Sequence, residues 1–482
     1  MKSLMFVMIA ARVAAANPDP AVISPGPPAE PVRTVPRPVA AEDVSGAPLP
    51  GDESGRVDAG DGGDSSSRRF ARGALFVPRS LLYILLFPVG RAIWAEERYD
   101  LQRRWKRTFY NQDQTIGVYP YLWYETGFGA TAGARFFYKN VFGADEELGL
   151  LAMYGGHYFS DLDGSFRTGH RLGDRLELEV FGRYLHRPRD FFFGIGNGSK
   201  IDAPLPVPID PLTNTAAVET RFKERLGRVA AIADVRLWDV LYLRAGGAFS
   251  DYKFGLSSTG PAIDQVYDPN ALIGFGGYRD AYTEGQLVWN SRDYVSPFEP
   301  APLFSVGSLA AVYGGRRFRI GSGSGSGSGS DYWRYGIDLQ RFFRIGQGPR
   351  VLSLRLHGEA VSGSIVDVPF NELPRLGGTI YLRGYQVDRF RDRVAAVGSV
   401  EYLWDLSRYL ASSVFVDVGR VYPSFEDLSA HGLRVGFGVS FQLHTITSFL
   451  GSLSIATSKD GGVFVNVLFD PVYLIHERVR RR

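Results

Sequence analysis

Hydrophobic and polar residues alternate along most of the chain from about residue 115 onward. In the stretch 433–443 every odd position carries Leu, Val or Phe, and every even position carries Arg, Gly, Ser or Gln. The stretches 333–340 and 352–359 repeat this pattern. A period of two predicts β-strands with one apolar and one polar face. Such strands fit a soluble sandwich with the apolar face inward, or a membrane barrel with the apolar face toward lipid, and alternation alone does not distinguish the two.

The lengths of the connections between the expected strands distinguish a membrane barrel from a soluble sandwich. Four connections that follow odd-numbered strands are long, whereas most that follow even-numbered strands have only a few residues, with 293–302 of middling length. This asymmetry is typical of outer-membrane barrels, whose long loops are extracellular. The long connections are 188–213, 255–279, 317–330 and 362–394.

The sequence therefore predicts an all-β fold, a 16-stranded antiparallel transmembrane β-barrel over residues 115–470 with a short N-terminal amphipathic helical segment. An even number of strands places both ends of the barrel in the periplasm, so a basic periplasmic tail is expected at 471–482. The expected strands are 115–126, 129–139, 147–158, 161–171, 174–187, 214–236, 239–254, 280–292, 303–316, 331–344, 350–361, 395–404, 411–420, 432–443, 448–457 and 463–469.

The residues before the barrel divide into three segments. Residues 1–16 combine an early lysine, an apolar core and three alanines, which predicts a secretory signal peptide. Residues 17–68 hold ten prolines between Pro18 and Pro50 and end in a Gly/Asp/Ser run, which predicts a disordered linker.

The third segment, 69–110, is basic and amphipathic and is expected to form helices on the periplasmic side, broken at Pro88. One interpretation is that these helices lie on the surface of the periplasmic leaflet, with leucines in the acyl boundary and arginines at the headgroups. The other is a plug packed in or under the barrel.

Composition agrees with the barrel. The chain has 57 Gly, 33 Phe and 25 Tyr with a mean hydropathy of -0.09, and no apolar run approaches the roughly 18 residues that a membrane helix needs. The absence of cysteine excludes disulfides and thiolate metal sites. A net charge of +3 gives no reason to expect a nucleic-acid partner.

Motifs for catalysis are missing from the sequence. No phosphate-binding P-loop, zinc-protease His-Glu-x-x-His or Gly-x-Ser-x-Gly elbow occurs. The run 161–164 reads Asp-Leu-Asp-Gly and is too short for a calcium loop. We therefore expect no enzyme activity, no cofactor and no metal.

One long connection carries an informative run, 376–385, which ends in Leu382, Arg383, Gly384 and Tyr385. By itself an Arg-Gly-Tyr tripeptide is compatible with an ordinary loop turn in a chain so rich in Gly and Tyr.

The two strands after this connection place acidic residues on their polar faces. In the first, the apolar residues share one parity and leave Glu401 facing inward. In the second, the valines share one parity and leave Phe415, Asp417 and Gly419 facing inward. A guanidinium suits such a pair of carboxylates because its planar fork binds bidentately and keeps its proton. Gly384 permits a close backbone approach, and Gly419 is expected to leave room for the loop tip.

At these residues the chain resembles the BamA/TamA-type assembly and translocation barrels, also called the bacterial surface antigen family. In that family the sixth extracellular loop bears a hydrophobic-Arg-Gly-aromatic signature and folds into the lumen, where its arginine meets acidic residues of strands twelve and thirteen. The resemblance implies a lumen motif of Arg383, Gly384, Tyr385, Glu401, Phe415, Asp417 and Gly419.

The resemblance also implies a function in the outer membrane of a Gram-negative bacterium: the insertion, assembly or translocation of protein or lipid. A weak seam between the first and last strands is expected, and Pro120 supports it because proline removes a ladder donor. Most family members carry POTRA domains before the barrel. Because none fits residues 17–110, we expect a POTRA-less member.

The expected partners are outer-membrane lipid and lipopolysaccharide, and an unfolded or translocating polypeptide or lipid substrate, with the barrel itself monomeric. Two other functions remain open: a passive diffusion channel, and a surface-exposed structural barrel that acts through its loops. In the channel interpretation four inward charges set the selectivity, namely Arg334, Arg355, Glu359 and Arg434.

Overall fold

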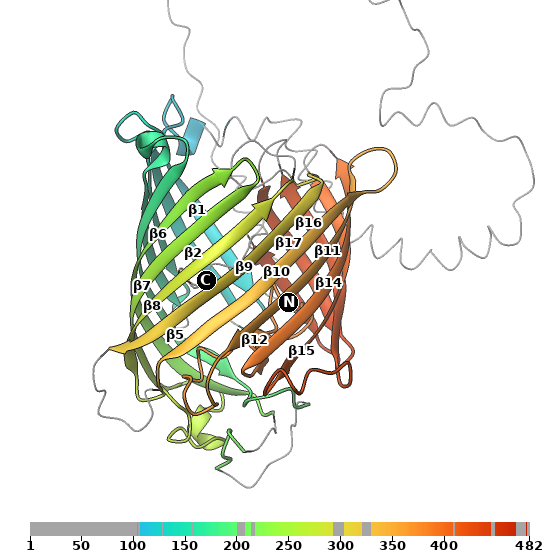
Figure 1. Ribbon diagram of the computed structural model, residues 1–482. Helices are drawn as coiled ribbons and strands as arrows, with labels where there is room; N and C mark the ends of the chain where they lie inside the picture. Colours follow the sequence, from blue (N-terminus) through green and yellow to red (C-terminus); the bar gives the residue numbers. More distant parts are fainter. Residues whose placement is uncertain are drawn as a thin grey trace, which may run out of the picture. The chain divides into compact units, whose positions relative to one another are not determined.

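The alternating stretches pair in sequence order, and the last strand meets the first, so that sixteen antiparallel strands close into a barrel (Figure 1). This confirms the predicted fold class. The computed structural model describes residues 104, 107–127, 129–156, 159–199, 208–213, 217–292, 303–320, 329–407, 410–444, 449–468 and 479.

Each of the sixteen expected strands overlaps one strand of the barrel. The barrel strands are β1 (Ile116–Glu125), β2 (Gly129–Lys139), β3 (Glu147–Tyr154), β4 (Ser160–Arg167), β5 (Leu176–Phe192), β6 (Thr220–Trp238), β7 (Leu241–Leu256), β8 (Tyr278–Asn290), β9 (Gly307–Ile320), β10 (Tyr332–Arg344), β11 (Arg350–Val361), β14 (Val394–Ser407), β15 (Leu410–Tyr422), β16 (Arg434–His444), β17 (Phe449–Ser458) and β18 (Val463–Leu468).

Among the described residues after β1, four short elements are not part of the barrel wall. Two are 3-10 helices, η4 (Gly169–Leu172) and η5 (Ile263–Gln265), and two are the strands β12 (Arg375–Leu376) and β13 (Phe390–Arg391). The strand expected at 161–171 ends earlier, at Arg167, because the chain turns into η4.

The two faces of the wall differ as a membrane barrel requires. On the outer face, Val400 of β14 is 48% exposed and Val416 of β15 is 44% exposed. On the inner face of the same strands, Glu401 is 3% exposed and Asp417 is fully buried. The apolar outer face therefore fits lipid, and the polar residues line the lumen.

Connection lengths divide the barrel into two ends. The long connections 193–219, 257–277 and 362–393 gather at one end, which is the lower end in Figure 1. At the other end β6 and β7 are joined by two residues, 239–240. The connection 291–306 between β8 and β9 is the long exception at this end.

The seam between β1 and β18 is the shortest junction in the described barrel. Only two residue pairs close it, Tyr124 with Val467 and Glu125 with Asn466. Along its other edge, β1 pairs with β2 over its whole length, from Ile116 to Glu125. Most of the first edge of β1 therefore has no strand partner among the described residues, and Pro120 lies in that part.

Little of the N-terminal helical segment is described. Residues 107–109 are helical, and the Tyr110 ring stacks on Tyr119 and packs against Phe137, both on the lumen face of the wall. This end of the segment therefore lies on the inner wall, while the rest of 69–110, the expected linker and the expected signal peptide lie outside the described residues. In the part of the chain that the structure describes, no helix is long and apolar enough to cross a bilayer.

One residue of the expected periplasmic tail is described, Val479. It is 6% exposed and packs with Phe181 and Ala230 on the lumen face. Its carbonyl oxygen accepts a hydrogen bond from Arg228 Nη1 at 2.9 Å. Val479 therefore lies inside the barrel, not in the periplasm as predicted, because an apolar position in the basic tail finds an apolar patch on the inner wall. The other tail residues lie outside the described residues.

Candidate functional site in the barrel lumen

The connection between β11 and β14 folds into the lumen around a small hairpin. In this hairpin β12 pairs with β13, Arg375 opposite Arg391 and Leu376 opposite Phe390. Leu376, Leu382 and Phe390 are buried and pack against the inner residues of β14 and β15. Burial of these apolar side chains offsets part of the entropy cost of ordering so long a loop.

Arg383, at the tip of this lumen loop, makes a bidentate contact with Asp417. Its Nε and Nη2 donate to Asp417 Oδ2 and Oδ1, both at 2.9 Å, and its backbone N–H donates to Oδ2 at 2.8 Å. Its Nη1 donates to Glu401 Oε2 at 2.8 Å. The structure thus brings together the three charged residues that the sequence singled out. We call Arg383, Glu401 and Asp417 the lumen clamp.

The lumen clamp is almost completely removed from solvent. Arg383 is 4% exposed, and its guanidinium lies 3.5 Å from the centre of the Phe415 ring. The second oxygen of Glu401 accepts a hydrogen bond from Ser413 Oγ at 2.6 Å. A buried charge of this kind is stable only while its partners are present, and removing one partner typically costs about 3–5 kcal/mol.

The backbone at the loop tip is strained where the clamp forms. Leu382 has φ +57° although it is not a glycine, and Gly384 has φ +94°. A Cβ at Gly384 would collide with the carbonyl oxygen of Thr457, and a Cβ at Gly436 with that of Arg383. The loop tip therefore packs closely against β17 at Gly384 and against β16 at Gly436.

Gly419 has other surroundings than expected, and the structure also places Tyr385. Gly419 was expected to leave room for the loop tip, but a Cβ there would first meet Ala396 and Val397 of β14. That prediction is wrong, because Gly436 on β16 makes the room instead. Tyr385 packs edge-on against Phe390, with ring centres 5.1 Å apart, and its hydroxyl donates to the carbonyl oxygen of Val435.

A second anchor holds the loop at Tyr381. Its ring stacks on His357 of β11, with centres 4.1 Å apart, and its hydroxyl accepts a hydrogen bond from Arg355 Nη2 at 3.2 Å. Arg355 in turn pairs with Asp338 at 2.6 Å. No sequence signal linked Tyr381 to these strands.

A third anchor is Glu372. Its carboxylate accepts hydrogen bonds from Arg334 Nη2 at 3.0 Å and from the Tyr252 hydroxyl at 2.9 Å. Arg334 also pairs with Glu359 at 2.6 Å. Across the lumen, Arg434 pairs with Asp460 at 2.7 Å. The four charges that the channel interpretation assigned to selectivity are therefore all held in ion pairs.

Two buried arginines join the lumen loop to the connection between β5 and β6. The carbonyl oxygen of Arg391 accepts a hydrogen bond from the Gly196 N–H at 2.7 Å, and Arg391 Nη2 donates to the carbonyl oxygen of Phe191 at 3.2 Å. Arg389 Nη2 donates to the carbonyl oxygen of Gly198 at 2.8 Å. Burial lowers the pKa of Arg389 and of Arg391 to about 10, so both remain charged at neutral pH.

An apolar cluster at the same end of the barrel joins residues of three long connections, the lumen loop among them, to the ends of neighbouring strands. We call it the loop cap. Aromatic rings meet edge to face in it, as at Phe192 and Phe370 with ring centres 5.8 Å apart. Its buried members are Phe192, Ile195, Ile209, Phe222, Ile263, Tyr267, Leu272, Tyr332, Val361, Val368, Phe370 and Leu373.

Comparison with known proteins adds a family domain. Residues 312–457 match the family model described as the Omp85 superfamily domain, and this range contains the lumen clamp. No curated protein matches the chain.

The solved structures that resemble the chain include one BamA and two CdiB proteins. BamA from Haemophilus ducreyi, in a form lacking POTRA domains 1–3, gives a TM-score of 0.48 at 14% identity over 73% of this chain and 70% of that one. CdiB from Escherichia coli gives 0.44 at 9% identity over 73% and 62%, and CdiB from Acinetobacter baumannii gives 0.44 at 10% over 74% and 60%. The chain spans less than two thirds of the length of both CdiB chains.

Proposed function

We propose that this chain, whose residues 312–457 match the Omp85 superfamily domain, is a barrel of a Gram-negative outer membrane and that it inserts, assembles or translocates protein or lipid in that membrane. Its substrate is an unfolded or translocating polypeptide or a lipid, and the barrel works as a monomer.

The observation that carries the proposal is the seam. Two residue pairs join β1 to β18, whereas β17 and β18 share six. An unpaired strand edge is a template for another strand, and backbone groups without partners are costly in lipid. A junction this short can part at low cost and offer the edge of β1 to an incoming segment.

The interior favours this function over a diffusion channel. The loop cap covers one end of the lumen, and the lumen loop is anchored inside at Arg383, Tyr381 and Glu372. These elements take up interior space that a diffusion channel would keep open for solutes. A strand that pairs with β1 at the seam does not need an open lumen.

A disulfide across the seam tests the proposal, since the chain has no cysteine of its own. Tyr124 and Val467 lie directly opposite each other, so Tyr124→Cys with Val467→Cys should form a crosslink. Full-length protein in liposomes is given an unfolded eight-stranded outer-membrane barrel as the probe, and folding is followed by heat-modifiability on a gel. The oxidised variant should fold the probe no faster than empty liposomes, and reductant should restore the rate.

The matched control is Ala132→Cys with Tyr154→Cys, a cross-strand pair between β2 and β3 near the same end. Its oxidised form should act like the unmodified protein. If the oxidised seam variant keeps full activity, the seam does not open during function. A large, steady conductance in planar bilayers together with no folding of the probe would instead support the diffusion channel.

A further inference from the structure

Three basic side chains form one row across the outer surface of β5, β6 and β7. His186 lies directly opposite Arg225, and Arg225 lies directly opposite Lys253. Their positions have the same parity as Val229 and Phe249, which are 60% and 45% exposed on the outer face. The row therefore faces away from the lumen, toward the membrane and its surface.

This basic row is poorly compensated by the protein. Like charges directly opposite each other across a sheet are destabilising. Among the described residues no carboxylate forms an ion pair with Arg225 or Lys253, and the nearby Asp251 faces Arg279 at 3.6 Å. Arg225 and Lys253 are both exposed on the outer face, so their charges are accessible from outside the protein. These positive charges would be compensated by an anion that binds from outside the protein.

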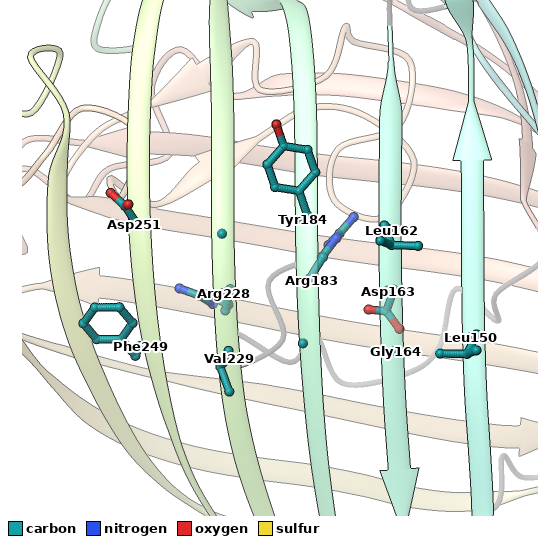
Figure 2. A pocket seen from close by; sticks show the side chains of 12 residues that line it. Leu150, Leu162, Asp163, Gly164, Arg183, Tyr184, Arg228, Val229, Phe249 and Asp251 are labelled. Atoms are coloured by element: carbon teal, nitrogen blue, oxygen red, sulfur yellow. The ribbon is translucent and has the colours of Figure 1, made fainter.

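An apolar groove begins beside the basic row, on the side of the row that faces the short-turn end of the barrel (Figure 2). In the next row of outward-facing cross-strand pairs toward the short turns, Tyr184 lies opposite Gly227. In the row after that, Gly182 lies opposite Val229. Because the glycines have no side chains, the outer surface of the sheet is lower at these positions, and neighbouring side chains form the walls of the groove. The groove has a volume of about 550 Å³ and its walls include Leu150, Leu162, Tyr184, Val229 and Phe249.

The groove and the row lie where a bilayer surface is expected. β6 has 19 residues, whereas a membrane strand needs about 9–11, so β6 continues beyond the membrane. Trp238 marks its end at the short turns, and Arg225 lies in the part toward the long loops. Aromatic residues such as Tyr184 gather at membrane surfaces. The groove is thus in the leaflet nearer the long loops, with the basic row at its headgroup level.

We propose that this outer face binds a phosphorylated lipid of the outer leaflet. The phosphate lies on Arg225 and Lys253, beside His186, and an acyl chain occupies the groove over Gly182 and Gly227. Charge complementarity selects the phosphate, and the apolar groove, which opens toward the bilayer, selects a lipid over a soluble anion. The site lies away from the lumen clamp and the seam, so it does not depend on the proposed function.

The test measures lipid binding to the full chain in detergent micelles by native mass spectrometry. The probes are bisphosphorylated lipid A, the same lipid without its phosphates, and inorganic phosphate as a competitor. Arg225→Gln with Lys253→Gln should weaken binding of the bisphosphorylated lipid roughly tenfold to a hundredfold, or about 1.4–2.7 kcal/mol in total, because both exposed cations that face the phosphate are lost. Binding of the dephosphorylated lipid should be weak and unchanged by these substitutions.

Two controls separate the parts of the site. Arg344→Gln with Arg350→Gln removes the same charge at the short-turn end and should leave binding unchanged. Gly182→Leu fills the groove, and a Cβ there has no neighbour closer than 3.9 Å, so the barrel should fold while lipid binding falls. Equal binding by the Arg225/Lys253 variant and the unmodified protein would overturn the proposal. So would full competition by inorganic phosphate at concentrations similar to the lipid, which would indicate a site for a soluble anion.

Discussion

The carbonyl oxygen of Arg383 lies so close to the Cα of Gly436 that no side chain can stand between them. This contact joins the tip of the lumen loop to β16, while the side chain of Arg383 reaches Asp417 on β15. A single residue thus fixes the loop to three adjacent strands: its carbonyl oxygen packs on β16, and its guanidinium pairs with Asp417 on β15 and with Glu401 on β14.

Gly436→Ala should displace the loop tip. The added methyl group collides with backbone, which cannot move as a flexible side chain can, so we expect a loss of about 1–3 kcal/mol in the free energy of unfolding. Limited proteolysis should show faster cleavage within 363–393. The control is Gly227→Ala, since a Cβ there has nothing within 4 Å. If both variants resist protease equally, the close approach does not hold the loop.

Arg383→Ala should release the lumen loop and make residues 363–393 sensitive to external protease, because Glu401 and Asp417 are then buried without their cation. Asp417→Ala should act similarly, since it removes three of the hydrogen bonds made by Arg383. Glu401→Ala should act more mildly, because it removes one.

The double variant Arg383→Ala with Asp417→Ala should be no worse than either single variant in unfolding midpoint and in protease sensitivity. Residues that share one buried interaction are not additive in a double-mutant cycle. Additive losses would mean that the two side chains contribute independently, against the geometry of the lumen clamp.

Single cysteines should establish which end of the barrel faces outward. Ser258 and Asp427 are exposed in connections at the long-loop end, and Gly346 is exposed in a short turn at the other end. On intact cells an impermeant maleimide should label Ser258→Cys and Asp427→Cys but not Gly346→Cys. Labelling of Gly346→Cys alone would reverse the orientation of the barrel.

Asp392 should make the packing of the lumen loop depend on pH. Burial raises its pKa from an ordinary 3.8 to about 6, although the Arg393 N–H donates to it at 2.8 Å. The folded protein therefore holds this proton more tightly than the unfolded chain does. The contribution of Asp392 to the free energy of unfolding should therefore be largest below about pH 4, fall as pH rises to about 6, and then level off.

Asp392→Asn keeps the acceptor oxygen and removes the charge. It should stabilise the protein above pH 6 by about 1–3 kcal/mol and flatten the pH profile, as measured by urea midpoints between about pH 4 and pH 8. An unchanged profile in this variant would show that another group titrates.

Period-two alternation was sufficient to predict the barrel wall. Strands with one lipid face and one lumen face carry a strong pattern, and each of the sixteen was located in this way. The ends were less well predicted, because a strand can continue beyond the membrane with little change of pattern, as β6 and β7 do. Parity along β14 and β15 also predicted which faces Glu401 and Asp417 occupy.

The contents of the lumen were much harder to predict. β12 and β13 have two residues each, too few to show a period. The inward parity of Arg334 and Arg355 was visible in the sequence, but their partners come from the loop and from neighbouring strands, where register decides the contact. The pairing of Gly196 with Arg391 brings together residues far apart in the sequence and left no local signal.

The contacts of the lumen clamp and those of Arg391 differ in how far apart the partners lie along the chain. Arg383 is 18 positions from Glu401 and 34 from Asp417, whereas the bond from Arg391 to Phe191 spans 200. Closing a short segment costs less entropy than closing a long one, and local contacts form sooner. The clamp is therefore expected to assemble within the C-terminal half, before β1 meets β18. The lumen loop then enters the interior together with the strands that hold it, and the N-terminal half closes around a loop already in place.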